Sequence, residues 1–479
     1  MARGRKKPKP YTKLMSLLAL SGTNSLSGGY DIDYSLKFEN DNSEGLVNNY
    51  SGDGTPTQWT FSAWVKRTEI SVNTFIFAAN NSNIRFIDGN YIRVEMYTGS
   101  ATYYYDTAAL FRDTSAWMHI VFKYDSTQAS AANRTKLWVN GVLNESFGQY
   151  DTHTNLPQNA TIGFGEAASN FQVGYNYVGG VNWKGFCGYM AEFHYTDGVL
   201  NDADAFGESD EDSGIWKPKQ YTGSHGSKGI YLKFDDSSDL GKNSASGGVG
   251  DFTETNITAA DQATDTPTNN FATMNPLMNN TGNFLAISEG GTRAVVATTA
   301  YKTAASSIGV SAGKWYWEVK LTDMNTITAM GITAPYYWDT DYSFGGCVYY
   351  GQPAQRYNNS SASFYGATYA TGDIIGFALD MDASPPTMTC YKNNVSQGNL
   401  FSGLSIGGAG AALLPPIEDG YFAKLVAYGN NTFDSNFGGY TAFTISSAAS
   451  DENGYGTFEY APPSGYLAIC TKNLAENGG

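Results

Sequence analysis

Histidine and cysteine are scarce in this chain of 479 residues, which contains four of each. The cysteines, at positions 187, 347, 390 and 470, lie far apart and form no Cys-x-x-Cys pair, so their spacing does not indicate a zinc site. Scattered cysteines in a glycine-rich chain are more often buried free thiols. His119 alternates with apolar residues in its segment and is expected to be structural.

Charged residues are also few, at 15% of the chain, and they are unevenly placed. Residues 1–13 contain six basic residues and no acid, which leaves 23 basic against 45 acidic residues, a net −22, in the remainder. An acidic body disfavours binding to nucleic acid or to an anionic membrane. No stretch reaches the ~20 apolar residues of a membrane span. We therefore expect no nucleic-acid partner and no membrane insertion.

Long amphipathic helices are missing, and short alternating segments stand in their place. Phe61, Ala63 and Val65 share one face of a predicted strand, and Asn140-Gly141 is a strong hairpin turn. The chain has 54 glycines and 34 tyrosines, which suits many short strands joined by tight turns. This pattern predicts an all-β protein built from antiparallel sandwiches.

One strand pattern occurs twice along the chain. The two copies comprise residues 61–69, 117–125 and 136–141, and residues 315–323, 373–382 and 389–394. Val65 precedes Asn140 by 75 positions, and Val319 precedes Asn393 by 74. The matched spacing predicts two tandem β-sandwiches of one broad architecture.

These patterns divide the chain into four parts. Residues 1–29 form an extended arm, 30–256 the first sandwich, 257–282 a polar linker with two prolines, and 283–479 the second sandwich. We expect the arm to be an anchor that is ordered only by its partner; a disordered N-terminus is the alternative. The predicted anchoring residues are Arg3, Arg5, Lys6, Lys7, Lys9 and Lys13.

Each sandwich resembles a known domain family. The first resembles a laminin-G-like, concanavalin-A-like jelly roll, and the second resembles a SPRY domain. Residues 61–66, 117–125, 136–142, 161–163 and 186–193 carry the first resemblance, and residues 313–319, 329–332, 372–380, 391–394 and 414–416 carry the second. Both resemblances imply a two-sheet sandwich, a scaffold on which fold alone does not decide function.

The order of the two domains, with the short motifs at 264–271, 274–277 and 463–474, resembles virion appendage proteins of tailed bacteriophages. That resemblance implies a non-enzymatic tail-fibre or appendage subunit, assembled in the host cytoplasm and located in the virion. Its arm would dock on tail, portal or capsid proteins, and a homo-oligomer such as a trimer is expected. The alternative is a capsid fibre or decoration module whose aromatic loops make subunit contacts.

Aromatic clusters predict where such a protein would bind host-surface glycan. Sugar rings stack on aromatic side chains, while amides and carboxylates take the hydroxyl groups. Two consecutive stretches of the second sandwich are too aromatic to face the core entirely, and two shorter ones stand in the first. The candidates are Tyr336, Tyr337, Trp338, Asp339, Tyr349, Tyr350, Gln352, Arg356 and Tyr357, with Tyr104 and Trp183 as weaker ones.

Catalysis and metal binding have little support. Glycoside hydrolysis needs two carboxylates that face the scissile bond, and Glu192 and Glu318 each stand alone in a predicted strand. We expect no catalytic residue, which makes a polysaccharide depolymerase the least favoured alternative. No cofactor is expected; a calcium ion at Asp380 and Asp382 is the one metal hypothesis, against simple turn capping.

Overall fold

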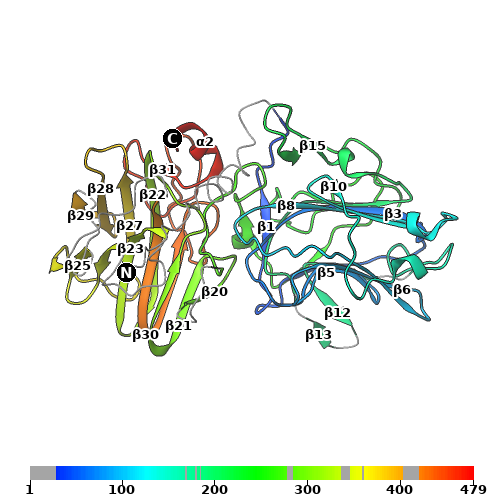
Figure 1. The fold of residues 1–479 in the computed structure, drawn as a ribbon, viewed down its shortest axis with the longest axis horizontal. Helices are drawn as coiled ribbons and strands as arrows, with labels where there is room; N and C mark the ends of the chain where they lie inside the picture. Colours follow the sequence, from blue (N-terminus) through cyan, green and yellow to red (C-terminus); the bar gives the residue numbers. More distant parts are fainter. Residues whose placement is uncertain are drawn as a thin grey trace, which may run out of the picture.

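The computed structural model describes residues 29–167, 170–178, 181–183, 185–277, 284–335, 346–358, 361–402 and 420–478. These residues form two β-sandwiches that lie side by side, which confirms the predicted fold class (Figure 1).

The first sandwich consists of an eight-stranded and a seven-stranded antiparallel sheet. The larger sheet contains, in spatial order, β10 (Val142–Leu143), β9 (Thr135–Val139), β8 (Met118–Asp125), β3 (Gln58–Arg67), β14 (Gly188–Asp197), β1 (Ser35–Phe38) and β19 (Gln262–Ala263), with β17 (Ile230–Leu232) on β14. The smaller sheet contains β18 (Thr253–Thr255), β2 (Gly45–Asn49), β11 (Asn170–Val173), β4 (Thr74–Ala79), β5 (Ser82–Phe86), β6 (Ile92–Tyr97) and β7 (Thr102–Asp106).

Aromatic rings fill the space between these two sheets. Phe61 on β3 and Phe193 on β14 meet Phe77 on β4, with ring centroids 5.0 to 5.9 Å apart. Large rings of this kind bury much apolar area and hold the layers in register. The predicted placement of Phe61, Ala63 and Val65 on one strand face is confirmed, and this face points inward, because all three residues belong to this core.

Short elements connect the strands of the first sandwich. They are the hairpins β12 (Asn176–Val178) with β13 (Val181–Trp183) and β15 (Gly207–Ser209) with β16 (Trp216–Pro218), and the 3-10 turns η1 (Ala131–Asn133), η2 (His153–Asn155), η3 (Ala203–Ala205) and η4 (Ala259–Asp261).

The second sandwich is one sheet of twelve strands folded onto itself. Its strands are β26 (Ser361–Phe364), β25 (Gln355–Asn358), β24 (Gly346–Tyr350), β23 (Ile327–Thr333), β30 (Phe422–Asn436), β22 (Lys314–Met324), β27 (Ile374–Asp380), β28 (Thr387–Lys392) and β29 (Val395–Ser402), with β21 (Arg293–Ala305) on β30, β20 (Ala286–Ser288) on β21, and β31 (Leu467–Ala468) parallel to β22. A short helix, α2 (Thr471–Asn477), follows β31.

Strand β30 belongs to both layers of this sandwich. Its residues 422–428 pair with β23, and its residues 431–436 pair with β22. Gly429 lies between the two stretches with a φ of 80°, a conformation that a side chain would strain. The strand therefore turns from one layer to the other at Gly429, around a core that includes Trp315, Trp317 and Phe377.

The segment expected to be a linker is not a loose connection. Residues 257–277, called here the seam segment, contain β19 and then a stretch in which Asp265, Phe271 and Met274 are buried. Backbone N–H groups of Thr264 and Ala272 donate to carbonyl groups of the second sandwich, at 2.9 and 3.0 Å. The polar composition of the segment reflects this buried hydrogen bonding rather than exposure to solvent.

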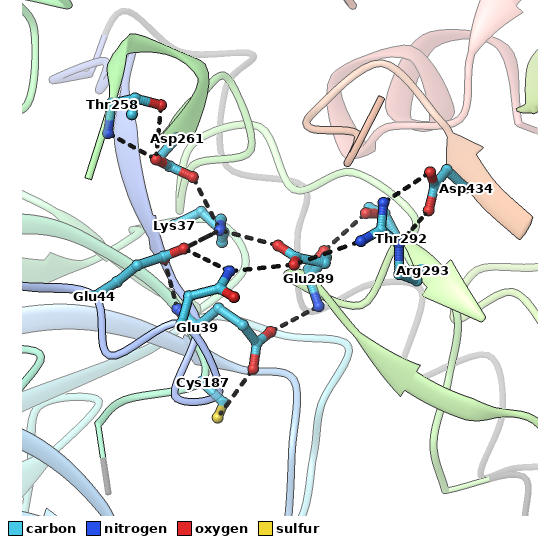
Figure 2. A network of polar contacts seen from close by, with 12 residues as sticks. Lys37, Glu39, Glu44, Cys187, Thr258, Asp261, Glu289, Thr292, Arg293 and Asp434 are labelled. Carbon is cyan, nitrogen blue, oxygen red and sulfur yellow. Dashed lines mark hydrogen bonds and ion pairs between the residues drawn. The ribbon is translucent and has the colours of Figure 1, made fainter. Parts of the chain in front are cut away.

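A buried polar network also joins the two sandwiches (Figure 2). The Lys37 Nζ atom on β1 lies 2.9 Å from Glu44 and Asp261 carboxylates and 3.2 Å from Glu289, which belongs to the second sandwich. Arg293 binds the Asp434 carboxylate through two N–H groups, at 2.7 and 2.9 Å, and lies 3.7 Å from Glu289. The boundary thus contains fixed charge pairs, which favours one relative position of the two sandwiches.

Candidate binding face

Strand β24 divides the aromatic candidates between two environments. Side chains alternate along a strand, so Cys347 and Tyr349 point into the sandwich core while Val348 and Tyr350 point outward. The two adjacent rings at 349 and 350 were predicted to share one exposed surface. Of the two, only Tyr350 points outward, and Tyr349 points into the core.

Tyr349 lies in the core and is unsuited to stacking on a ligand. Its ring has no exposed area and makes edge contacts with Tyr365 and Tyr369, with centroids 5.0 Å apart in both cases. Its hydroxyl group donates to the Ala367 carbonyl. Burial raises the pKa of this hydroxyl above its usual value. Tyr349 is thus a packing residue, because its place in the strand faces the other layer.

Arg356 on β25 connects strands at the edge of the sandwich. Its guanidinium donates to the Ser363 hydroxyl at 2.9 Å and to the Leu400 carbonyl on β29 at 3.0 Å. These bonds tie the edge of one layer to the edge of the other. The guanidinium that was expected to bind a glycan is therefore occupied by hydrogen bonds within the sandwich.

The remaining described candidates of the second sandwich lie on the outside of the β21–β30–β23–β24–β25–β26 layer. Tyr350 and Tyr357 meet edge to face with centroids 5.5 Å apart, and the Tyr301 and Tyr428 rings are 5.2 Å apart on the neighbouring strands. We define the outer aromatic face by these side chains and the two apolar ones beside them: Tyr301, Ile327, Tyr350, Tyr357, Phe364 and Tyr428.

Strand register brings these six side chains onto one surface. Tyr428 stands opposite both Tyr301 and Ile327, which joins three strands in one row. Phe364 stands opposite Gln355 on the edge strand and is 85% exposed. Tyr350 is largely covered, so the accessible rings are those of half-buried Tyr301, Tyr357 and Tyr428 and exposed Phe364.

Polar groups suited to hydroxyl recognition stand beside these rings. The Tyr357 hydroxyl donates to the Gln355 side-chain carbonyl at 3.3 Å, and Gln352 is exposed in the turn that joins β24 to β25. Rings flanked by amides are the composition expected of a surface that stacks on sugars and hydrogen-bonds their hydroxyl groups. Gln352 and Tyr357 are therefore compatible with the predicted role.

Four residues of the outer aromatic face were not among those predicted from the sequence: Tyr301, Ile327, Phe364 and Tyr428. Tyr301, Ile327 and Tyr428 stand in strands where apolar residues occupy both faces, as in Leu425-Val426-Ala427-Tyr428, and Phe364 ends a strand of only four residues. Alternation alone shows that two faces exist but does not show which one is covered. The pairing of β21, β30 and β23, which brings distant stretches together, was needed to find the surface.

Several predicted residues lie outside the described residues. These are Tyr336, Tyr337, Trp338 and Asp339 in the second sandwich, and the six basic residues of the arm. The backbone of Trp183 is described in β13, but its side chain is not. Their roles stay predictions.

Tyr104 belongs to a second aromatic cluster, on the outside of the smaller sheet of the first sandwich. The Arg93 guanidinium lies 4.4 Å from the Tyr104 ring centroid and within 6 Å of the Tyr91 and Tyr150 rings. Asp106 holds this guanidinium through two N–H groups, at 2.7 and 2.8 Å. The cluster is a fixed cation surrounded by rings, and Tyr150 is 59% exposed.

The two isolated glutamates are held by their surroundings. Glu318 is completely buried and accepts hydrogen bonds from the backbone N–H groups of Glu459 and Tyr460 at 2.9 and 2.8 Å. Burial raises the pKa of this carboxyl. Glu192 accepts from the Tyr231 hydroxyl at 3.0 Å and lies 3.4 Å from His194 Nε2. The depression beside Glu192, lined also by Trp64, is too small for a sugar.

Serine and histidine side chains also meet, without the geometry of a nucleophile and its base. Trp216 Nε1 donates to His119 Nδ1 at 3.0 Å, so neutral His119 carries its proton on Nε2 and donates it to the Ser62 hydroxyl oxygen at 2.8 Å. Burial lowers the pKa of His119 to about 3, which keeps the ring neutral. His119 therefore has the structural role expected from the sequence.

One further stretch has the spacing of a nucleophile motif. Residues 403–407 read Gly-Leu-Ser-Ile-Gly, and they lie outside the described residues. A serine in that motif requires a histidine partner. All four histidines of the chain, at 119, 153, 194 and 225, stand in the first sandwich.

The predicted calcium ligands cap backbone groups. Asp380 accepts from the N–H groups of Asp382 and Ala383 at 3.1 and 2.9 Å and pairs with Lys314 at 3.0 Å. Asp382 accepts from the Gly313 N–H at 2.8 Å. Within the described ranges, no group of three or more acidic, histidine or cysteine residues is arranged to hold a metal ion. These contacts favour the alternative of turn capping.

Comparisons with known proteins identify both domains. Residues 40–205 match the family model of the concanavalin A-like lectin/glucanases superfamily, and residues 314–415 match that of the SPRY domain. The chain therefore contains a concanavalin A-like domain followed by a SPRY domain. No curated protein matches the chain. In the part of the chain that the structure describes, no helix is long and apolar enough to cross a membrane.

Solved structures include partial matches to this chain. The SPRY domain of human HERC1 is 17% identical, with a TM-score of 0.26, and the match covers 31% of this chain and 89% of that one. A human SPRY domain is 18% identical, with a TM-score of 0.25 and coverage of 30% and 91%. A heptameric SAP-like pentraxin from Limulus polyphemus is 14% identical, with a TM-score of 0.28 and coverage of 36% and 80%.

Proposed function

We propose that this chain is a non-enzymatic binding protein, a tail-fibre or appendage subunit of a tailed bacteriophage that recognises host-surface glycan. The observation that carries the binding role is the outer aromatic face, where partly exposed rings stand beside amide groups on a sandwich. A concanavalin A-like and a SPRY domain support a carbohydrate- or protein-binding role at the coarser level. Loops and faces on a rigid scaffold suit recognition, because the scaffold positions them.

The placement in a virion is supported by the domain order and by the sequence motifs around residues 264–277 and 463–474. Four buried cysteines without disulfides agree with assembly in a reducing host cytoplasm. In this proposal the basic arm docks the subunit onto tail, portal or capsid proteins, and the sandwiches extend from the attachment point as part of a homo-oligomer.

Binding to host polysaccharide tests the proposed recognition. The full chain is mixed with purified host-surface polysaccharide, and binding is compared between wild type and the double variant Tyr357→Ala/Phe364→Ala. The control is Val395→Ala, which removes another exposed apolar side chain, 65% exposed, from β29 in the other layer of the same sandwich. We expect at least a tenfold loss for the double variant, and none for the control.

Two outcomes of this experiment contradict the proposal. Release of reducing sugar ends from the polysaccharide would make the protein a depolymerase. Equal binding, or no binding, by wild type and double variant would show that the outer aromatic face does not bind the polysaccharide. Cryo-electron microscopy of the particle tests the location: if this face is buried against capsid or neighbouring subunits, the protein is a fibre or decoration module without glycan binding.

A further inference from the structure

A buried lysine lies against a side-chain amide at the boundary of the first sandwich and the seam segment. Lys66 Nζ, at the end of β3, lies 2.7 Å from the Asn270 side-chain carbonyl oxygen and 2.6 Å from the Asp265 carboxylate. The Phe271 carbonyl oxygen lies 3.0 Å away. Lys66 has no exposed area, so these three groups take the place of water around its amine.

The two partners of this lysine are themselves held in place. The Asp265 carboxylate accepts from Trp117 Nε1 at 2.8 Å, and the Asn270 amide nitrogen donates to the Ser115 carbonyl at 2.8 Å. The Tyr189 ring covers the amine, with its centroid 5.8 Å from Nζ. The amide carbon of Asn270 is one carbonyl bond, about 1.2 Å, from the oxygen that Nζ contacts, so a small shift brings amine and carbon together.

The other buried lysine of this boundary has a different environment. Lys37 faces the carboxylates of Glu44, Asp261 and Glu289, and although its burial opposes charge, nearby acidic groups raise the pKa of its amine (Figure 2). Three carboxylates keep Lys37 an ammonium ion, which has no lone pair with which to attack. Lys66 has one carboxylate partner and one neutral amide.

A single buried acid–amine pair can exchange its proton. Charge separation is costly where water is absent, and transfer of one proton from the Lys66 ammonium to Asp265 makes both groups neutral. Burial raises the pKa of the Asp265 carboxyl, and the Lys66 ammonium opposes this effect. The transfer leaves a desolvated neutral amine, which is the nucleophilic form of lysine, beside the Asn270 amide.

We propose that Lys66 and Asn270 form an intramolecular isopeptide bond without an external catalyst, with Asp265 as the proton carrier. The Lys66 lone pair attacks the Asn270 amide carbon, and the tetrahedral intermediate forms while Asp265 donates a hydrogen bond to its oxygen. A carbon–nitrogen bond to Lys66 forms, and the bond to the amide nitrogen of Asn270 breaks.

The protons and atoms of this step balance. The Lys66 ammonium loses two protons in all: one leaves with the departing amide nitrogen as ammonia, and one stays on Asp265, which ends as a neutral carboxylic acid. The products are one secondary amide and one ammonia molecule. No oxidant, reductant or second substrate is required, and Asp265 stays uncharged after its ammonium partner is gone.

The bond would fasten the seam segment to both sandwiches. Asn270 already exchanges backbone hydrogen bonds with Thr471 at the start of α2, with its carbonyl accepting at 2.9 Å and its N–H donating to the Thr471 hydroxyl at 3.0 Å. A covalent link from Asn270 to Lys66 on β3 would connect this part of the second sandwich with the larger sheet of the first. It would close a loop between positions 204 residues apart.

Intact-mass measurement of the purified full-length protein tests the proposal. The expected mass is lower than that of the sequence by one ammonia. Tryptic peptides should then contain one cross-linked pair, with the segment around Lys66 joined to the one around Asn270 and no cleavage after Lys66. The peptide that contains Lys37 should stay unlinked and serves as an internal control.

Three variants separate the cross-link from other losses of ammonia. Lys66→Arg keeps the buried positive charge without a nucleophilic amine, Asn270→Ala removes the electrophile, and Asp265→Asn removes the proton carrier. All three should retain their full sequence mass. Ring closure at Asn140-Gly141 also releases ammonia, but that loss would persist in Asn270→Ala and would leave the Lys66 peptide unlinked.

The wild-type measurement alone decides the question, even where a variant fails to fold. A wild-type protein with its full sequence mass and with free Lys66 and Asn270 peptides would overturn the proposal and leave a buried ion pair. A loss of ammonia that maps only to other residues, with Lys66 and Asn270 unlinked, would overturn it as well.

Discussion

Replacing Lys37 by methionine should destabilise the protein far more than removing an exposed lysine. The Lys37 side chain is 1% exposed, and its amine holds three carboxylates that are 3 to 16% exposed (Figure 2). Breaking a buried ion pair from one side costs about 3–5 kcal/mol, because the remaining charges stay buried without a partner. We expect Lys37→Met to lower the free energy of unfolding by that amount at pH 8.

Lowering the pH should reverse part of this loss. Burial raises the pKa of the Glu44 carboxyl and the Lys37 ammonium opposes this effect, so Lys37→Met should raise that pKa further, and the folded variant should bind more protons than the unfolded chain. The stability of the variant relative to wild type therefore increases as the pH falls through the raised pKa of Glu44. The double variant Lys37→Met/Glu289→Gln, which has one buried charge fewer, should recover part of the loss at pH 8.

Denaturant unfolding at pH 8 and pH 5 measures both effects. The matched control is Lys242→Met, which removes an exposed ion pair to Asp236. The two side chains of that pair are 51% and 36% exposed, so its loss should have little effect on the free energy of unfolding. If Lys37→Met costs no more than this control, or if its cost is the same at both pH values, the reasoning about uncompensated buried carboxylates is refuted.

Three further predictions concern Glu39, His119 and the tyrosines of β24 and β25. Burial raises the pKa of Glu39 to about 7, so the folded protein binds more protons than the unfolded one between pH 4.5 and 7. The free energy of unfolding of wild type should therefore fall by up to about 3 kcal/mol as the pH rises over that range, and Glu39→Gln should show a flatter profile in denaturant unfolding. Burial lowers the pKa of His119 to about 3, so the folded protein binds fewer protons than the unfolded one below pH 6.5. The free energy of unfolding should therefore fall by about 3 kcal/mol between pH 6.5 and pH 4. His119→Gln should be less acid-sensitive in the same assay, and equal sensitivity would contradict this. Tyr349→Ala should cost about 3–5 kcal/mol in thermal unfolding, whereas Tyr357→Ala should cost much less while weakening glycan binding, and the reverse order would contradict the assignment of the two rings.

Local patterns were sufficient for the fold because each strand carries its own periodicity. The alternation at 61–65 correctly placed Phe61, Ala63 and Val65 on one face, which the structure shows to be the inward one, and the repeated spacing predicted two sandwiches. Tyr349 and Tyr350 could not be separated in this way, because both faces of β24 are apolar and covered. The direction of each ring depends on which face of β24 meets the other layer, and that is a property of the whole sheet.

Long-range pairing explains most of what the sequence did not reveal. Lys66 and Asp265 are 199 positions apart, and only the fold brings them within 2.6 Å. The polar residues of the seam segment were interpreted as a linker because composition does not distinguish solvated polar groups from those that find buried partners. Arg356 was assigned to a ligand for the same reason, although carbonyl groups of β29 occupy its guanidinium.

The buried seam segment bears on how such a protein can change by recombination. A chain exchanged at residue 257 would keep Lys66 without Asp265, and one exchanged at residue 283 would keep Glu44 and Asp261 without Glu289. In the first exchange a buried lysine would lose its charge partner at a cost of about 3–5 kcal/mol, a large fraction of the stability of a typical domain. We expect natural exchange to move the two sandwiches together, as one heritable unit, and to vary the residues of their outer faces instead.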